Sequence, residues 1–382
     1  MAAPMQMSPA DANMLARNMV LGQAINMIQS IASGTITAPL GAVVNVPVRN
    51  VGMLKRFILE ISFNIKQAAA ETLTLQKWGP ANVCSQLIFT DLNNQNRINT
   101  AGWHLHALAT ARRQMAYGAA FTNDSPVSFG SNFPVIVATA SVTATNQLVR
   151  MFYELPVSYG DYDLRGAIFA NVVNATMNIQ FTVNPNIVVG SAADATLAVY
   201  KSSTPTDLGS ITNFQWNLYQ NYLDQLPQGK QGPIVPQLDL STAYDIKNTA
   251  IIGNLSVGQE CPIPYANFRN FMSTIVILDN GGTLNVGSDV NYWALQSANY
   301  TNIFKYDPFF AALLTRQLIA DDVPNGTYYF DHRAKPISTV QYGNMQLVVN
   351  PSVVNANASL LVGFEALALI NQITQAGSLY AT

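Results

Sequence analysis

Two histidines separated by one residue, His104 and His106, have the clearest potential for chemistry in this sequence. Residues two apart on a β-strand share a face, so both imidazoles could reach one metal ion there. A third ligand is missing, because Thr110-Ala111-Arg112-Arg113 follows and no carboxylate occurs before Asp124. The remaining histidine, His332, lies in the other half of the chain. We therefore expect a structural pair near a barrel edge or subunit contact, and no metal site.

Two pairs of carboxylates, Asp161 with Asp163 and Asp321 with Asp322, have the residue type that glycosidases use as acid and nucleophile. All four aspartates lie beside Gly or Pro in turn-like sequence, where carboxylates commonly cap turns. Neither pair lies in a recognisable catalytic motif. We predict that both stabilise turns.

The sequence also lacks the motifs that usually surround a catalytic nucleophile or form a phosphate-binding loop. Ser125 and Ser241 lack a nucleophile elbow, and no P-loop or dinucleotide fingerprint occurs. Gly281-Gly282 follows Asp279-Asn280 and is typical of a hairpin turn. We therefore predict no catalytic residue, no cofactor and no enzymatic activity.

The two cysteines, Cys84 and Cys261, are far apart in the sequence and have no metal or redox spacing. Cys84 also has no evident base partner. We expect two free, buried thiols, with a long-range disulfide as the alternative.

Charge is scarce throughout the chain. Charged residues make up 10% of the 382 residues, whereas an ordinary soluble domain carries about 25%. The net charge of −2 and the lack of any basic cluster larger than a pair such as Arg112-Arg113 argue against direct contact with nucleic acid. The hydrophobic fraction of 49% argues against disorder, and no apolar run is long enough for a transmembrane helix. Because interface cores are depleted of charge, this composition favours a surface covered by partners.

The first element is predicted to be a helix from Ser8 to Ser33, capped by Ser8 with Pro9 in its first turn. Its apolar stripe contains Met14, Leu21, Ile25 and Ile28, and Arg17 is the exception among its uncharged polar residues. We predict that these five residues contact a membrane surface or a neighbouring subunit. The alternative is a helix that packs on its own domain.

From Thr35 onward the hydrophobic period changes to two, which predicts a chain made mostly of strands. Helices are expected to interrupt them at about Pro308–Ala320 and, as a second possibility, within Trp103–Met115. The predicted strands are Val44–Val48, Phe57–Ile65, Gln86–Thr90, Leu148–Leu155, Met177–Val183, Phe214–Tyr222, Phe271–Leu278, Asn291–Leu295, Thr327–Phe330, Gln346–Val349 and Ser359–Phe364.

Three short matches suggest that the chain contains two similar halves. Asp91 aligns with Asp279 at an offset of 188, Asp163-Leu164-Arg165 with Asp331-His332-Arg333 at 168, and Gln180–Pro185 with Gln346–Pro351 at 166. The Asp-x-Arg match predicts a loop brace present in both halves. Each half of about 174 residues suits an eight-stranded jelly roll. We predict an all-β chain with an N-terminal helical arm (1–35), a first jelly roll (36–230) and a second jelly roll with a C-terminal tail (231–382).

Several motifs resemble the major capsid proteins of tectiviruses, bacteriophages with an icosahedral shell around an internal membrane. They are Gly79-Pro80-Ala81-Asn82, Gly102-Trp103-His104-Leu105-His106, Tyr219–Pro227, Asp239-Leu240-Ser241-Thr242, Asp279-Asn280-Gly281-Gly282 and Tyr342-Gly343-Asn344. The likeness runs in unbroken order from about Asn50 to Phe364 and is weakest at the N-terminal helix and the C-terminal tail.

This resemblance implies two eight-stranded jelly-roll barrels in one chain, with short inserted helices, as in the lineage that includes adenovirus hexon. It also implies a homotrimer of pseudo-hexagonal outline that is assembled in the host bacterial cytoplasm and tiles the virion shell. The implied partners are neighbouring trimers, minor capsid, vertex and membrane proteins, and the internal lipid membrane through the N-terminal helix. The competing interpretations are a jelly-roll carbohydrate-binding module and a cupin-like metalloenzyme built on His104 and His106.

Overall fold

The computed structural model of the chain describes most of its length. The described residues are 8–66, 72–76, 79–117, 136–137, 141–142, 147–172, 175–193, 197–204, 208–229, 232–233, 235, 238–253, 255–280, 289–298, 300–319 and 326–369.

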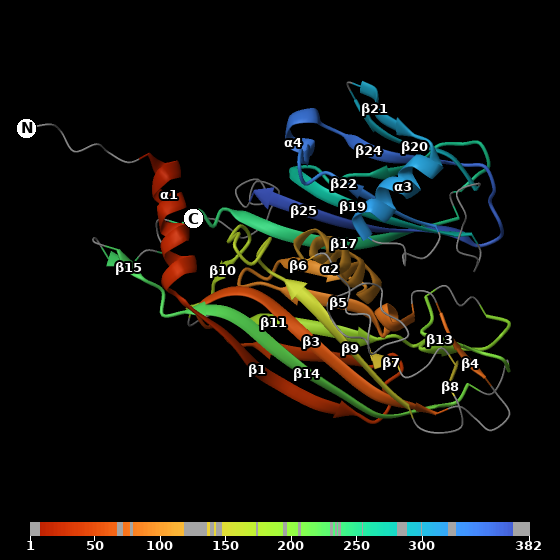
Figure 1. Cartoon of the computed structure of the whole chain (residues 1–382), viewed down its shortest axis with the longest axis horizontal. Coiled ribbons are helices and arrows are strands. Elements are labelled where there is room, and N and C mark those ends of the chain that lie inside the picture. Colours follow the sequence, from red (N-terminus) through yellow and green to blue (C-terminus); the bar gives the residue numbers. More distant parts are fainter. Residues whose placement is uncertain are drawn as a thin grey trace, which may run out of the picture.

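Eight strands of the N-terminal half form two facing sheets (Figure 1), which we call the first jelly roll. One sheet contains the first, eighth, third and sixth of these strands: β1 (Ile25–Ile36), β14 (Ser210–Asp224), β3 (Met53–Lys66) and β9 (Gln147–Pro156). The other contains the second, seventh, fourth and fifth: β2 (Val43–Val48), β11 (Met177–Val183), β5 (Cys84–Thr90) and β6 (Asn96–Thr100). This interleaved strand order is the jelly-roll topology.

The C-terminal half repeats the same order and forms the second jelly roll. Its first sheet contains β17 (Thr242–Ile252), β25 (Ala358–Leu369), β19 (Arg269–Asn280) and β22 (Thr327–Asp331). Its second sheet contains β18 (Cys261–Pro264), β24 (Met345–Pro351), β20 (Val290–Ser297) and β21 (Tyr300–Tyr306). The predicted double jelly roll is therefore confirmed, and all eleven predicted strands are present.

Short elements complete the architecture. The helices are α1 (Pro9–Gln23), α2 (Gly102–Tyr117), α3 (Pro308–Ile319), α4 (Thr339–Tyr342) and the 3-10 turn η1 (Gly79–Asn82). The minor strands are β4 (Leu73–Leu75), β7 (Ile136–Val137), β8 (Ser141–Val142), β10 (Ile168–Phe169), β12 (Val188–Val189), β13 (Tyr200–Ser202), β15 (Gln228–Gly229), β16 (Gly232–Pro233) and β23 (Ile337–Ser338).

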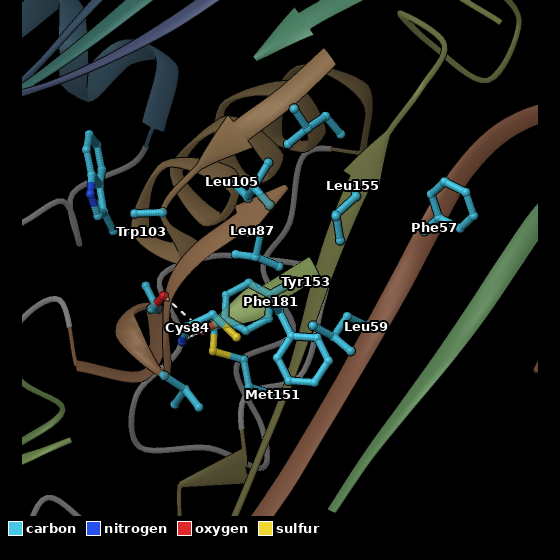
Figure 2. Packing of buried hydrophobic residues seen from close by; sticks show 14 of the residues in the cluster. Phe57, Leu59, Cys84, Leu87, Trp103, Leu105, Met151, Tyr153, Leu155 and Phe181 are labelled. Atoms are coloured by element: carbon cyan, nitrogen blue, oxygen red, sulfur yellow. Dashed lines mark hydrogen bonds between the residues drawn. The ribbon is translucent and has the colours of Figure 1, made fainter. Parts of the chain in front are cut away.

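The strands exist because alternate residues are apolar and fill the space between the sheets. Along β3, Phe57, Leu59, Ile61, Phe63 and Ile65 are all buried, and the residues between them are only partly so. Figure 2 shows Phe57 and Leu59 in this core, together with side chains from the neighbouring strand β9 and from β5 and β11 of the facing sheet. Because each such side chain contributes about 1.5–3 kcal/mol on burial, the alternation fixes the register of the sheet.

A seam joins the two jelly rolls within the chain. Strand β6 pairs in parallel with β17, with Ile98 opposite Ile246, so one sheet of each unit continues into the other. Helix α2 follows β6 and lies between the two units (Figure 1). The ring of its His104 lies against the backbone of Gly363 on β25. The continuous sheet and the packing of α2 therefore both join the two jelly rolls at the same boundary.

The predicted N-terminal helix is too long. Helix α1 ends at Gln23, and Ile25 begins a strand that pairs with β14 over its whole length. Gly22 weakens the helix near this point, and the β-branched Ile25, Ile28 and Ile31 favour the extended backbone. Backbone pairing with β14 therefore overrides the helical spacing of the apolar residues. As a result, the arm predicted for residues 1–35 includes strand β1 of the first jelly roll.

One of the three internal matches is also wrong. Asp91 follows β5, the fourth strand of its unit, whereas Asp279 ends β19, the third strand of the other. Strand pairing in the two equivalent hairpins, β5 with β6 and β20 with β21, instead aligns Leu87 with Trp293 and Thr100 with Tyr306, an offset of 206. The other two matches join topologically equivalent segments. A short apolar stretch followed by Asp is common in β-proteins, so this match does not establish which strands of the two halves are equivalent.

We expect the substitution Gly363→Ala to destabilise the seam, because a Cβ at residue 363 would overlap the ring of His104. Overpacking of this kind costs about 1–3 kcal/mol of unfolding free energy. The penalty should become smaller in a His104→Ala background, which removes the ring, and urea unfolding of the double-mutant cycle measures this coupling. Gly22→Ala is the matched control, since nothing lies within 4 Å of a Cβ there. Equal penalties in both backgrounds would contradict the assigned contact.

Candidate assembly surfaces

The His104-x-His106 pair lies in helix α2 and not on a strand. Residues two apart on a helix project about 200° from each other, so the two imidazoles do not converge on one ion. His104 Nδ1 is instead 2.7 Å from the Thr100 hydroxyl. Among the described residues, no group of three or more His, Cys, Asp or Glu side chains could hold a metal ion. The geometry that the metalloenzyme interpretation requires is absent at this pair.

His104 and His106 are buried and His332 is partly buried, and the loss of hydration lowers the pKa values of all three. The pKa of His104 falls to about 3, although the nearby Glu365 carboxylate opposes the shift. The pKa values of His106 and His332 fall to about 4, the latter against the opposing charge of Asp331. These imidazoles are therefore neutral parts of the packed interior at neutral pH.

Glu365 is itself fully buried in strand β25 at the seam. Its carboxylate accepts hydrogen bonds from the Tyr244 hydroxyl at 2.8 Å and from the Ser273 hydroxyl at 2.5 Å. These bonds replace the hydration that a carboxylate loses on burial. Sequence reasoning did not identify this group, because a lone Glu in an apolar strand carries no motif.

The predicted loop brace is present in both jelly rolls. Arg165 donates to both carboxylate oxygens of Asp163, at 2.6–3.1 Å, and Arg333 makes the same fork on Asp331 at 2.8 Å. Burial alone would raise the pKa values of the two aspartates, but hydrogen bonds from the arginines outweigh it and leave both pKa values below their ordinary range. A bidentate arginine holds a carboxylate in one orientation, so these pairs stiffen the turn after the sixth strand.

The other candidate residues serve as local anchors. Asp161 lies 3.3 Å from the Arg56 guanidinium, and the Ser241 hydroxyl donates to Asp239 at 2.5 Å. Ser125, Asp321 and Asp322 lie outside the described residues.

The two cysteines are free and buried, as predicted. Burial raises the pKa values of both thiols, so neither is an activated nucleophile. Cys84 lies beside Tyr153 in the core (Figure 2), and the Tyr153 hydroxyl accepts a hydrogen bond from the Cys84 backbone N–H.

The five predicted N-terminal contact residues divide between two elements. Met14, Arg17 and Leu21 lie on α1, whereas Ile25 and Ile28 lie on β1. Helix α1 packs on its own chain through Ala16 and Val20, which contact a cluster that includes Met53 and Leu223. Met14, Ile25 and Ile28 remain exposed, while Leu21 is partly buried against that cluster. One face of the helix therefore packs on its own domain, as the alternative interpretation states, and the contact of the exposed residues with a membrane or a neighbouring subunit stays a prediction.

An apolar surface that sequence reasoning missed lies on the second jelly roll. Phe309, Phe310 and Leu313 of α3 are exposed, together with Ile303 of the preceding strand β21. Contiguous exposed apolar side chains of this size mark interaction sites in soluble proteins. The signal was present in the sequence, because the stretch Pro308–Leu314 is apolar on every side of the helix.

No described helix is both long and apolar enough to cross a bilayer.

Comparison with known proteins supports a viral shell as the context of these surfaces. The N-terminal model of the P3 major capsid protein family matches residues 1–226, and its C-terminal model matches residues 241–381. Major capsid protein P3 of Enterobacteria phage PRD1 is 38% identical over 376 residues, which cover 97% of this chain and 94% of that protein.

Solved viral structures share the fold at much lower identity. A chain of the Sulfolobus Turreted Icosahedral Virus structure superposes with a TM-score of 0.65 at 10% identity, covering 93% of this chain and 94% of that chain. A chain of the PBCV-1 virus capsid superposes with a TM-score of 0.53 at 9% identity, covering 91% and 96%.

The buried histidines predict a loss of stability on mild acidification. Their folded pKa values of about 3 to 4 lie below the unfolded value of about 6.5, so the unfolded chain binds more protons as the pH falls below 6.5. Each histidine then lowers the free energy of unfolding by about 1.4 kcal/mol per pH unit, which amounts to roughly 4 kcal/mol per unit for three. Urea unfolding at pH 7, 6 and 5, at one protein concentration, measures this slope.

A variant isolates the contribution of one imidazole. His332→Phe should remove about a third of the slope between pH 6 and 5, because phenylalanine does not titrate and can stack on Phe304 as His332 does. The aspartates of the two braces have lowered pKa values, so their loss of stability begins at lower pH and does not interfere. An unchanged slope would show that His332 is not held neutral in the fold.

Proposed function

Since the chain belongs to the P3 major capsid protein family, we propose that it assembles as a homotrimer of pseudo-hexagonal outline that tiles an icosahedral shell. It is a structural major capsid protein of the PRD1 type, and its location is the capsid shell of a phage virion. The capsid role follows from the family, and the trimeric assembly is the part that we propose.

The observation that carries the trimer is the duplication of one topology within the chain. Both jelly rolls have the same strand order in both sheets, and they lie side by side. Three such chains around one axis supply six similar units, and a closed cyclic trimer of this kind has a nearly hexagonal outline. Trimers of hexagonal outline can cover most of a closed shell with one kind of contact between neighbouring trimers.

The composition of the surface agrees with assembly from many copies. Few charges are available, and exposed apolar side chains occur on both jelly rolls, as at Val43 and Phe309. Uncharged contacts vary little with ionic strength, whereas exposed ion pairs are screened by salt. Neighbouring trimers therefore associate through weak, replaceable contacts that permit correction of errors.

We assign the N-terminal region to the inner side of the shell. Met14, Arg17 and Leu21 on α1, with Ile25 and Ile28 on β1, contact the internal membrane or a neighbouring trimer. The support is the exposure of Met14, Leu15, Ile25 and Ile28 in a segment that packs on its own chain through a different face. A helix that does not cross the bilayer buries its exposed apolar side chains at the boundary between headgroups and acyl chains.

The remaining features of this function follow from the same assignment. Minor capsid, vertex and membrane proteins of the virion are further partners, direct contact with nucleic acid is absent, and the role is structural and not enzymatic. Within the chain, the two jelly rolls divide near residue 230.

The trimer is tested by native mass spectrometry of the purified chain at micromolar concentration. We expect a species of about 124 kDa, three times the chain mass of 41.4 kDa. A stable 41.4 kDa monomer in dilute neutral buffer would contradict the proposed assembly.

The role of α1 is tested by deletion of residues 1–23, which removes the helix but leaves strand β1 in place. We expect trimers to persist and flotation with phosphatidylethanolamine and phosphatidylglycerol vesicles to decrease at least fivefold. Met14→Asp/Leu15→Asp is the matched variant, because it changes the exposed face without the internal contacts of Ala16 and Val20. Unchanged flotation of both proteins would refute the membrane contact.

A further inference from the structure

Proline recurs at one topological position of the two jelly rolls. Pro47 lies in β2, and Pro262 and Pro264 lie in β18. These are the second strands of the first and second jelly rolls. In the other jelly-roll strands that the structure describes, proline is absent or occupies the last position. The duplicated topology therefore repeats this residue type together with the strand that carries it.

Both proline-containing strands lie at an edge of their sheet. Over the part of the chain that the structure describes, β2 pairs only with β11, and β18 pairs only with β24. An edge strand directs a row of backbone N–H and C=O groups away from its sheet, and this row can pair with a strand of another chain. The location of the prolines therefore affects which strands these edges can accept.

The hydrogen bonds at the end of β18 show which way its prolines face. The Tyr265 N–H donates to the carbonyl oxygen of Met345 at 3.0 Å, so the odd-numbered residues here direct their backbone groups toward β24. The direction alternates along an antiparallel strand. Pro262 and Pro264 therefore occupy the positions that face the open side, and neither has an N–H to present there.

The same reasoning places the proline of β2. The Val183 N–H donates to the carbonyl oxygen of Ala42 at 2.9 Å, so the even-numbered residues face β11. Val43, Asn45 and Pro47 then face the open side. The β18 edge thus lacks an N–H at both of its outward positions, and the β2 edge lacks one at Pro47.

Neither core packing nor strand propensity explains these prolines. Pro47, Pro262 and Pro264 are all exposed, so they add little to the packed interior. Proline is also depleted in strands, where β-branched residues such as valine and threonine are favoured. A property of the edge itself remains as their common feature.

The edges that join within the fold lack this feature. Strands β6 and β17 pair in parallel, and neither contains a proline. Each residue of these two strands therefore keeps an N–H that can take part in pairing. The contrast distinguishes an edge that extends a sheet from the edges at β2 and β18.

We propose that the prolines of β2 and β18 close these two edges to strand addition by a second copy of this chain. A strand that approached β18 would find no N–H at Pro262 or Pro264 to donate to its carbonyl oxygens. Those carbonyl groups would lose water without gaining a partner, which costs free energy. Other copies therefore contact these edges through side chains and do not extend the sheets.

This closure matters for a protein that gathers many copies in one shell. An unblocked edge on every copy would allow strands to pair outside the intended contacts and to form open-ended aggregates. Because both jelly rolls carry the block at the same strand, the protection extends to both halves of the chain.

Restoring the missing donors tests the proposal. Pro262→Thr/Pro264→Thr gives both outward positions an N–H and introduces a polar residue that favours strands. We expect the weight-average mass at tens of micromolar protein, measured by light scattering during size exclusion, to rise at least twofold above that of the wild type. Pro47→Thr tests the first jelly roll in the same way. Each variant is compared with the wild-type protein, so the test does not depend on the proposed trimer.

Two matched controls separate the backbone donors from other effects. Pro336→Thr removes an exposed proline from the loop between β22 and β23, away from both edges, and should leave the mass unchanged. Pro262→Lys/Pro264→Lys restores the same two N–H groups but adds positive charges, and charged side chains oppose pairing at an edge. This variant should also keep the wild-type mass.

Hydrogen exchange identifies the contact in the larger species. The amides of residues 262 and 264 should exchange at least tenfold more slowly in the Thr variant than in the Lys variant, because only the Thr variant places them in a new sheet. A raised mass without this protection would assign the association to side chains and overturn the proposal.

The remaining outcomes are equally decisive. Wild-type mass for the Thr variants of both edges, in proteins that unfold cooperatively in urea, would show that the missing donors do not limit association. An equal rise in mass for Pro336→Thr would also overturn the proposal. Either edge decides the question alone if the variant of the other does not fold.

Discussion

Backbone hydrogen bonding at the edges of sheets is the constraint on which the rest of this structure depends. Every second residue of an edge strand directs its N–H and C=O groups away from the sheet, and these groups need water or a partner. The first jelly roll satisfies the edge at β6 by pairing it with β17 of the second. One chain therefore uses its own second unit to cover its first, whereas β21 pairs only with β20 and β1 only with β14 among the described residues.

The scarcity of charge follows from the same constraint. Strands that are covered on both faces and at their edges have few positions where a charge can remain hydrated, and burial of an unpaired charge is costly. The charges that are present in the interior form specific pairs, as at Asp91 and Arg97, or accept hydrogen bonds, as at Glu365. The 10% charged fraction thus reflects the extent of the packed surface.

Most of the fold could be predicted from the sequence because strand alternation is a local property, evident in Met177–Val183 and Phe57–Ile65. The end of α1 could not, since Ile25 and Ile28 have helical spacing and only their pairing with β14 makes them a strand. The placement of His104 and His106 required knowledge of whether Trp103–Met115 is a helix. The apolar face of α3 was visible as a helix but not as a surface, because exposure depends on what the rest of the chain leaves uncovered. The Asp-x-Arg braces were predictable because both members lie within three residues.

The seam between the two jelly rolls and the exposed apolar surface of α3 differ in a way that suits different tasks. The seam forms once, during folding, and it buries Glu365 near His104, with hydrogen bonds to the carboxylate from Tyr244 and Ser273. The large side chains that α3 exposes, such as Phe309, are apolar. A carboxylate at such an exposed position would be desolvated in every association event, and that cost would be regained only where all partners were correctly placed. An aromatic ring avoids this barrier, because no charge is moved out of water when it is covered. A seam that forms once can therefore contain a hydrogen-bonded acidic group, whereas a contact that must close reversibly many times in one shell favours uncharged groups.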